Sequence, residues 1–297
     1  NRIMPDESLR FYLQRALGYS ITGMTTEEKL FMPWGPPATG KSTLLRAVAT
    51  CLGDYAAVVG GDTFAEQKAD GNAPRNDIAR LFGKRFVLAM ELPGNQRLAT
   101  GLLQRMTGGD VMVARFNYQE FFEFVSSAKA WLTSNSRPII PDNEPGMWRR
   151  VSQIPFQVVI PEAERDPGLK LALLDLYTGQ EAVFRWLVEG CGIWREVGLG
   201  APLVVIEASA AYRQDMDRLA EFIQDVCFIE EDATCTNQAI YASYQQWCQT
   251  NGERALGHKG FTQRLEAKGY ARRHGHSARE WRGIGLQGEG YRQAELS

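Results

Sequence analysis

The apolar positions between residues 30 and 161 follow two alternating patterns. Apolar runs of strand length lie at residues 30–34, 55–59, 86–90 and 130–133. Stretches whose apolar side chains recur at helical spacing separate these runs, at residues 42–52 and 98–107. Buried strands that alternate with amphipathic helices are typical of a parallel sheet with crossover helices. We therefore predict an α/β fold with a central parallel sheet over residues 29–161.

Helical patterns flank this domain on both sides. Before it, apolar side chains recur at helical spacing at Leu9, Tyr12, Leu13 and Leu17. They predict a collar of short helices over residues 1–28. After it, residues 164–199 have a helical pattern and lead into a loop rich in Gly and Pro. We assign residues 162–214 to a helical lid or linker.

The pattern of residues 215–290 predicts a separate, smaller domain. Three helical patterns and then an alternating segment follow one another, at residues 219–228, 237–248, 259–268 and 270–286. The net charge of the whole chain is only -2, but residues 254–287 hold eight basic and two acidic residues. Three helices and a basic hairpin describe a winged helix, and a local excess of Lys and Arg favours DNA as its ligand over a protein partner. The expected DNA contacts are Lys259, Arg264, Arg272, Arg273 and Arg282.

The composition excludes several classes of protein. With 44% hydrophobic and 23% charged residues among 297, the chain does not have the composition of a disordered protein. No run approaches the roughly 20 apolar residues of a membrane span, so we expect no membrane partner and a cytoplasmic location. The five cysteines form no CxxC pair, so we predict neither a zinc site nor a disulfide framework. The sequence begins at Asn1, close to a helical stretch, so we expect it to be part of a longer chain.

A glycine-rich loop follows the first apolar strand. The run from Gly35 to Ser42 matches GxxxxGK followed by Ser or Thr, with a strand before it and a helix after it. In such a loop the backbone N–H groups surround phosphates, the lysine reaches the β- and γ-phosphates, and the hydroxyl binds Mg²⁺. We predict that ATP and Mg²⁺ bind here, with nucleotide contacts from Gly35, Pro36, Pro37, Ala38, Thr39, Gly40, Lys41, Ser42 and Thr43.

Glu91 ends the apolar run at residues 86–90. A carboxylate at the carboxyl end of a buried strand can orient and deprotonate the water that attacks a bound nucleotide. We predict that Glu91 is this general base and that it joins Ser42 at the magnesium site; a surface glutamate is the alternative. Met90 stands where a second acid for magnesium would be expected, so phosphates and water would complete the metal's ligands.

Polar groups also accompany the two later strands. Asn135 follows the strand at residues 130–133 and could hold the attacking water or the γ-phosphate, although Asn is also a common turn residue. Arg149 and Arg150 precede an apolar run at residues 151–156. An exposed guanidinium there could reach the γ-phosphate of a neighbouring subunit as an arginine finger. A salt bridge and a contact with DNA are the alternatives.

Together, these elements resemble the superfamily 3 helicases, and in particular the phage and plasmid primase-helicases that are related to the poxvirus primase-helicase. The motifs that carry the resemblance are Ala16-Leu-Gly-Tyr-Ser20, Gly83-Lys-Arg85, Leu103 through Thr107-Gly-Gly-Asp110, Thr133-Ser-Asn135, Trp148-Arg-Arg150 with Ile154-Pro-Phe156, and Trp281-Arg-Gly283. The resemblance implies an AAA+-like homo-oligomeric ring, usually a hexamer, that translocates 3′ to 5′ on single-stranded DNA. It also implies an upstream primase domain and a location in the cytoplasm of a bacterial host.

The resemblance assigns two further roles. It selects Arg150 over Arg149 as the finger, because the finger of this superfamily directly precedes the strand that ends in an Ile-Pro-Phe-like turn. Residues 110–125 have the pattern of two strands joined by a short turn, and the resemblance makes this hairpin the loop that grips DNA. Its expected contacts are Arg115, Asn117 and Tyr118. Phe116 is a second aromatic that could stack on bases, and the alternative for both aromatics is a place in the core.

The predicted function is therefore that of an ATP-dependent DNA helicase from a phage or mobile-element replication system. One alternative is an ATP-switched scaffold that binds or loads an origin without robust unwinding. A small-molecule P-loop kinase is the other, but such kinases seldom reach this length or carry a basic winged helix.

Overall fold

The computed structural model describes residues 2–67, 75–92, 96–141, 144–252, 255–274 and 279–287. The chain divides into two compact units, Asn1–Met216 and Asp217–Ser297. Asn1 of the predicted collar and residues 288–290 of the predicted tail domain lie outside the described residues. Among the helices that are described, none is both long enough and apolar enough to cross a membrane.

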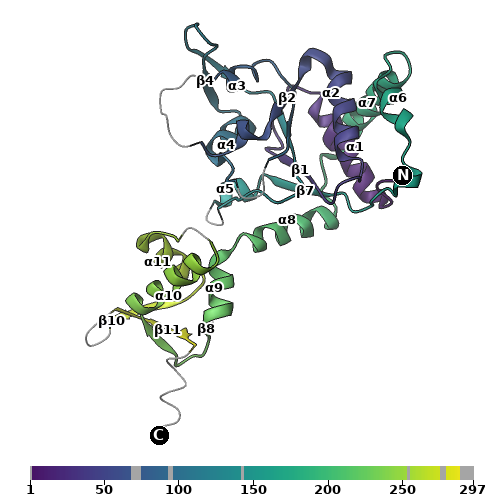
Figure 1. The fold of residues 1–297 in the computed structure, drawn as a ribbon. Helices are drawn as coiled ribbons and strands as arrows, with labels where there is room; N and C mark the ends of the chain where they lie inside the picture. The colour runs from purple at the N-terminus through teal and green to yellow at the C-terminus, as the bar shows by residue number, and fades with distance from the viewer. Residues whose placement is uncertain are drawn as a thin grey trace. The chain divides into compact units, whose positions relative to one another are not determined.

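The first unit is built on a five-stranded parallel sheet (Figure 1). The strand order is β2-β3-β6-β1-β7. The strands are β1 Leu30–Trp34, β2 Ala56–Gly60, β3 Phe86–Met90, β6 Lys129–Thr133 and β7 Val151–Pro155. The α/β fold and the parallel sheet predicted from the apolar pattern are confirmed.

Helices cover both faces of this sheet (Figure 1). One face packs against α1 Glu7–Ser20, α2 Lys41–Leu52 and α7 Gly179–Val197. The other packs against α3 Asn76–Ala79, α4 Thr100–Gly108 and α5 Pro145–Trp148. Successive side chains of a strand point to opposite faces of the sheet. Leu30 and Met32 pack in the core beside α3, α4 and α5, whereas Phe31 packs in the core beside α1, α2 and α7. Burial on both faces explains why these strands are continuous apolar runs.

The segment predicted as a collar of short helices forms one helix, α1. The Asp6 carboxylate caps it by accepting a hydrogen bond from the Leu9 N–H. Helix α1 packs on α7 so closely at Gly18 that a Cβ there would lie 2.2 Å from the backbone nitrogen of Cys191. The predicted collar is therefore part of the core of the first unit, and the expectation of several short helices was wrong.

Pro33 lies inside β1. On the β7 side the pairing continues through Pro33 and Ile154. On the β6 side regular pairing stops at Phe31 and returns only as an isolated bridge between Trp34 and Ser134. Proline cannot donate to a ladder, and the interruption on one side shows how the sheet accommodates it.

The region after β7 contains three helices, α6 Pro167–Leu174, α7 and α8 Leu203–Asp215. The apolar pattern did not separate α8 from the Gly- and Pro-rich loop before it. Only Val205 and Tyr212 of this helix are buried, so its apolar stripe is too short to give a helical period. Short 3-10 helices occur at Gly53–Tyr55, Gly61–Phe64 and Glu162–Glu164. The predicted hairpin is confirmed, with β4 Val111–Ala114 antiparallel to β5 Phe122–Val125.

The second unit has its own core. Its helices are α9 Arg218–Val226, α10 Asn237–Thr250 and α11 His258–Ala267. The strands β10 Ala271–His274, β11 Arg279–Arg282 and β9 Thr234–Thr236 form one sheet, and β8 Cys227–Phe228 pairs with β12 Gly285–Leu286. Trp281 is fully buried and donates a hydrogen bond from Nε1 to Asn237 Oδ1 at 2.9 Å. The three helices and the strand pair β10–β11 are those that the sequence pattern predicts.

Candidate nucleotide-binding site

The strand order brings three of the predicted site segments to the carboxyl edge of the sheet. β6 lies between β3 and β1, so the segments that follow these strands are neighbours. Glu91 follows β3 and donates its backbone N–H to the Thr133 carbonyl at 3.2 Å. Ser134 follows β6 and bridges to Trp34, the last residue before the glycine-rich loop. The loop, Glu91 and Asn135 therefore meet at one edge.

The glycine-rich loop contains three residues with positive φ. Gly35, Ala38 and Gly40 have φ values of 149°, 59° and 85°. A Cβ at Gly35 would lie 2.0 Å from the Phe156 carbonyl oxygen, so only glycine fits there. No side chain caps the first turn of α2. The N–H groups of a helix N-terminus need an acceptor, and a phosphate oxygen is a suitable one.

Lys41 is folded against this loop. Its Nζ donates hydrogen bonds to the carbonyl oxygens of Gly35 and Pro36 at 2.8 and 2.7 Å, and to Thr39 Oγ1 at 3.0 Å. The residue is only 6% exposed, and burial lowers the pKa of its ammonium group. The lysine is thus placed at the loop itself, which is where the motif needs its charge.

The remaining residues of the predicted contact set surround the same turn. Pro36, Pro37, Ala38 and Ser42 are exposed, whereas Thr39 is buried. Ser42 offers a hydroxyl oxygen from the first turn of α2, and Glu91 offers exposed carboxylate oxygens from the end of β3, which is separated from β1 by β6. Oxygen donors of this kind suit Mg²⁺, so the chemistry of these side chains fits the metal.

Glu91 is held in an unusual backbone conformation. Its φ is 64°, in the left-handed region that non-glycine residues rarely adopt. Ser134 Oγ donates to the Leu92 carbonyl at 2.7 Å, and a Cβ at Gly61 would lie 2.7 Å from the Leu92 nitrogen. Strained residues of this kind concentrate at functional sites, because the surrounding structure must impose them. The sequence pattern assigned no role to Ser134 or Gly61, and the available signal was the glycine pair Gly60–Gly61, where β2 ends.

Asn135 is exposed at the same edge. The turn that presents it is fixed by Ser134, whose Oγ accepts a hydrogen bond from the Ser136 N–H at 3.2 Å. Its amide is therefore open to a ligand at the edge that carries the loop and Glu91.

Arg150 lies at the opposite, amino edge of the sheet, directly before β7. The expected exposure of its guanidinium was wrong: its side chain is 8% exposed, against 66% for Arg149. Arg150 is buried because its Nε donates to Thr107 Oγ1 at 3.0 Å, its Nη1 donates to the Gly146 carbonyl at 2.7 Å, and its Nη2 pairs with Glu28 at 2.8 Å. In this single chain Arg150 has the contacts of a structural arginine.

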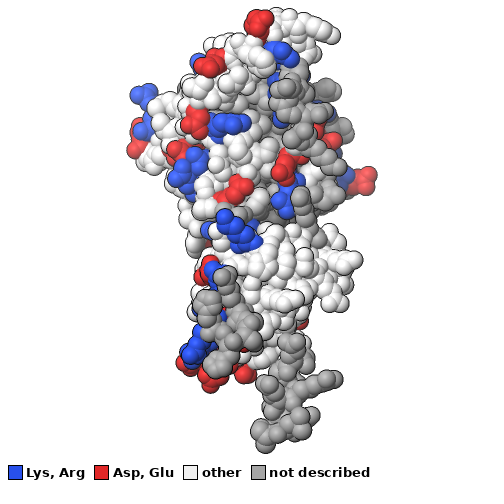
Figure 2. All heavy atoms as spheres, turned by 90° about the vertical axis from the view of Figure 1, so that its left-hand side faces the viewer, with Lys and Arg blue, Asp and Glu red and all other residues white. Residues whose placement is uncertain are grey.

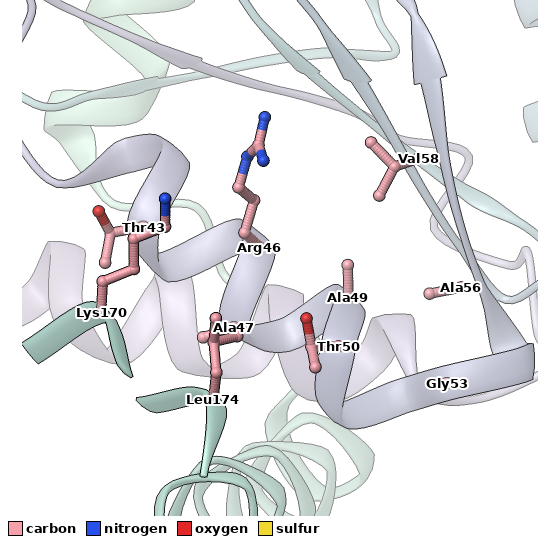
Figure 3. A pocket seen from close by; sticks show the side chains of 10 residues that line it. All are labelled: Thr43, Arg46, Ala47, Ala49, Thr50, Gly53, Ala56, Val58, Lys170 and Leu174. Carbon is pink, nitrogen blue, oxygen red and sulfur yellow. The ribbon is translucent and has the colours of Figure 1, made fainter. Parts of the chain in front are cut away.

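A cavity of about 320 Å³ lies beside α2, away from Glu91 and Asn135. Helix α2 and strand β2 line its two sides, and α6 contributes Lys170 and Leu174 (Figure 3). Of the predicted site residues it contains only Thr43. The cavity borders the loop helix but does not hold the predicted catalytic groups.

The turn of the β4–β5 hairpin is exposed, as are alternate residues of its two strands. Tyr118 is fully exposed with φ 63°, and Asn117 is exposed beside it. Arg115 is half-buried, with its guanidinium 4.6 Å from the centre of the Phe121 ring. Phe116 stacks on Phe122 with ring centres 5.4 Å apart and is packed against the core. Of the two aromatic candidates, Tyr118 is therefore the one that a ligand can reach.

The predicted basic contacts of the second unit differ in their surroundings. Lys259 and Arg273 are exposed. Arg272 pairs with Glu266, and its Nε donates to Glu266 Oε1 at 2.7 Å. Arg282 lies 3.8 Å from Asp232, and Arg264 is half-buried with partners of its own. On the face in Figure 2 basic and acidic side chains are interspersed over the first unit, so no single basic field covers that face.

The chain matches two families of proteins. Residues 34–150 match a family of unknown function (DUF5906), and residues 214–281 match the poxvirus D5 protein-like family. The chain is also similar to a "Putative helicase" of Acanthamoeba polyphaga mimivirus, at 26% identity over 84% of this chain and 28% of the relative. A "Putative helicase" of Frog virus 3 matches at 26% over 84% of this chain and 27% of the relative. A "Putative primase" of African swine fever virus matches at 25% over 84% and 28%.

The chain thus spans just over a quarter of the length of these relatives. Among solved structures, the A form of the apo C-terminal region of NrS-1 matches with a TM-score of 0.51 at 13% identity, over 74% of this chain and 54% of that one. This likeness supports the fold alone. The poxvirus D5-like match and the viral relatives support the primase-helicase family that the sequence motifs resemble.

Proposed function

We propose that this chain is the ATP-hydrolysing motor of a replicative DNA helicase of the superfamily 3 type. The observation that carries the proposal is the meeting of the Lys41 loop, Glu91 and Asn135 at one edge of the sheet. Hydrolysis of ATP by a P-loop ATPase requires groups that bind the phosphates and a residue that orients the attacking water. The similarity to viral proteins named helicase and primase supports DNA replication as the setting.

Each group at this edge has one task in the proposed reaction. The backbone N–H groups of the loop bind phosphate oxygens, Lys41 binds the β- and γ-phosphates, and Ser42 gives an oxygen ligand to Mg²⁺. The metal, when bound, neutralises charge on the phosphates. Glu91 orients the attacking water and accepts its proton. Asn135 hydrogen-bonds the water or the γ-phosphate.

Assembly into a ring, in our proposal a hexamer, would complete the site. Arg150 precedes β7 at the amino edge of the sheet, and Lys41 follows β1 at the carboxyl edge. Because the two edges lie at opposite ends of the strands, an arginine at the amino edge could contact only a nucleotide that is bound to another subunit. Arg150 is the proposed finger by resemblance, and it would have to leave Glu28 to act. Arg149, its exposed neighbour, is the alternative finger.

DNA is the proposed substrate of the motor. The exposed Tyr118 and Asn117 at the hairpin turn would contact single-stranded DNA, with Arg115 close to its phosphates. The second unit would act as a winged helix that binds duplex DNA through its basic residues. A primase domain upstream would make the full protein a primase-helicase.

A strand-displacement assay on a forked duplex tests the proposal. We expect displacement that requires ATP and disappears in both Lys41→Ala and Glu91→Gln, with 3′ to 5′ polarity. Nucleotide-dependent DNA binding without displacement would favour the ATP-switched origin scaffold instead. No binding of nucleotide at all would contradict both functions.

A further inference from the structure

Arg137 contacts the segment that enters the glycine-rich loop. It lies two residues beyond Asn135, and its guanidinium sits 4.3 Å from the centre of the Trp34 ring. Trp34 ends β1 and directly precedes Gly35. Nη2 of Arg137 also donates to Gln153 Oε1 at 2.9 Å, and Gln153 belongs to the neighbouring strand β7. Arg137 therefore fastens the turn that carries Asn135 to the start of the loop.

The same guanidinium reaches the last turn of α8. Nη1 of Arg137 forms an ion pair with Asp215, the final residue of that helix. The guanidinium of Arg137 also lies over Tyr212, 5.4 Å from the centre of the tyrosine ring. The Tyr212 hydroxyl donates a hydrogen bond to the Pro138 carbonyl at 2.5 Å. The chain passes into the second unit two residues after Asp215. One side chain thus joins the loop edge of the sheet to the end of the first unit.

The hydrogen bonding around Arg137 is incomplete. Its side chain is 17% exposed, yet its Nε has no hydrogen-bond partner among the described residues, and neither does Nε2 of the fully buried Gln153. Buried donors without acceptors raise the free energy of an arrangement. An anion that reached these two donors would supply the acceptor that they lack.

We propose that Arg137 is a positioning residue that couples the glycine-rich loop to the last turn of α8, so that nucleotide binding loosens this turn. A bound triphosphate brings negative charge to the edge where Trp34 and Asn135 lie, and this charge competes with the Asp215 carboxylate for the guanidinium. The inference rests on the proposed nucleotide binding at the loop. It adds a route from that site to the chain segment that enters the second unit.

Hydrogen exchange of residues 209–216, measured with and without a nonhydrolysable ATP analogue, tests the coupling. We expect the analogue to speed exchange there at least about fivefold in the wild type. In Arg137→Gln and in Asp215→Asn the response should fall below about twofold. Arg137→Lys keeps the positive charge and should restore part of it, which a purely structural role would not predict.

The matched control is Arg213→Gln, an exposed arginine of the same helical turn. It should keep the full response. An unchanged response in Arg137→Gln, or an equally weakened one in Arg213→Gln, would overturn the inference. So would a wild type that binds the analogue, as measured by calorimetry, but shows no response. A wild type that does not bind the analogue would overturn the proposed function as well, and calorimetry separates these two failures.

Discussion

Arg150 and Glu28 form an ion pair of 2.8 Å at the amino edge of the central sheet. The pair lies where α4, α5 and the start of β1 meet. The backbone carbonyl of Arg150 also accepts the Leu30 N–H at 2.8 Å. Arg150 is the proposed arginine finger for the nucleotide of a neighbouring subunit. Within its own subunit, however, it connects three separate segments of the chain.

Arg150→Ala should therefore destabilise the isolated chain. It removes the donors to Thr107 and Gly146 and one of the two guanidinium partners of Glu28, which costs about 1–3 kcal/mol for groups of this burial. Arg149→Ala removes an exposed guanidinium and should change the free energy of unfolding by less than about 0.5 kcal/mol. Urea unfolding of both variants measures this. Equal stabilities would show that the buried contacts of Arg150 contribute little.

Tyr118→Ala should weaken the binding of single-stranded DNA without affecting stability. Removing the ring under one stacked base costs about 1–3 kcal/mol, which is roughly a fivefold to hundredfold decrease in affinity. The melting temperature should stay unchanged because the ring makes no core contact. Tyr177→Ala is the control, since Tyr177 is also strongly exposed but lies outside the hairpin. Fluorescence anisotropy with a labelled oligonucleotide measures the affinities, and equal decreases in both variants would remove Tyr118 from the interface.

Arg273→Gln should weaken duplex binding more than Arg272→Gln does. Arg273 is exposed, whereas Arg272 already pairs with Glu266. Because Arg273 is expected to bind a DNA phosphate, its replacement should reduce the slope of log affinity against log salt by about 1. Titrations at several salt concentrations provide the slope. A slope that is the same in the wild type and Arg273→Gln would favour the protein-binding alternative for the second unit.

Lys129 should make stability depend on pH. Its Nζ donates to the carbonyl oxygens of Met24 and Ser127 at 3.2 and 2.8 Å and to that of Thr22, and burial lowers its pKa to about 7. In the unfolded chain Lys129 has its ordinary pKa of 10.5. Between pH 7 and pH 10.5 Lys129 is therefore protonated in the unfolded chain but largely deprotonated in the folded one. Stability should rise with pH across this window, by up to about 1.4 kcal/mol per unit.

The comparison with Lys129→Met isolates this contribution. The variant cannot titrate at this position, so its free energy of unfolding should rise less steeply between pH 7 and pH 10. Denaturant unfolding at several pH values measures both slopes. Parallel slopes would mean that the folded protein does not hold Lys129 at a lowered pKa.

The sequence predicted the strands of the sheet and the loop well, because each depends on local signals. The apolar run at residues 86–90 matches β3 at both ends, and the glycine spacing around Lys41 defines the loop without any tertiary information. The order of the strands cannot be inferred from local signals of this kind. It is this order, however, that makes Glu91, Asn135 and the loop neighbours. The burial of Arg150 was not predictable, because its partners Glu28, Thr107 and Gly146 lie on three separate segments.

Other features depend on long-range packing in the same way. Helix α8 has only two buried apolar residues, and its main anchors are polar, through Ser209, Tyr212 and Asp215. The left-handed φ of Glu91 is imposed by Gly61 and Ser134, which follow β2 and β6, and not by its own sequence. In the sequence such a site is marked only by small residues, here the Gly60–Gly61 pair and Ser134.

The ATPase rate with and without single-stranded DNA, for the wild type and Glu91→Gln, tests the central claim most directly. We predict hydrolysis that DNA stimulates, and a decrease of about 10²- to 10⁴-fold in Glu91→Gln with ATP affinity retained. Glu207→Gln, an exposed glutamate of α8, is the control and should turn over normally. Normal turnover in Glu91→Gln, or a wild type that binds ATP but neither hydrolyses it nor responds to DNA, would contradict the account.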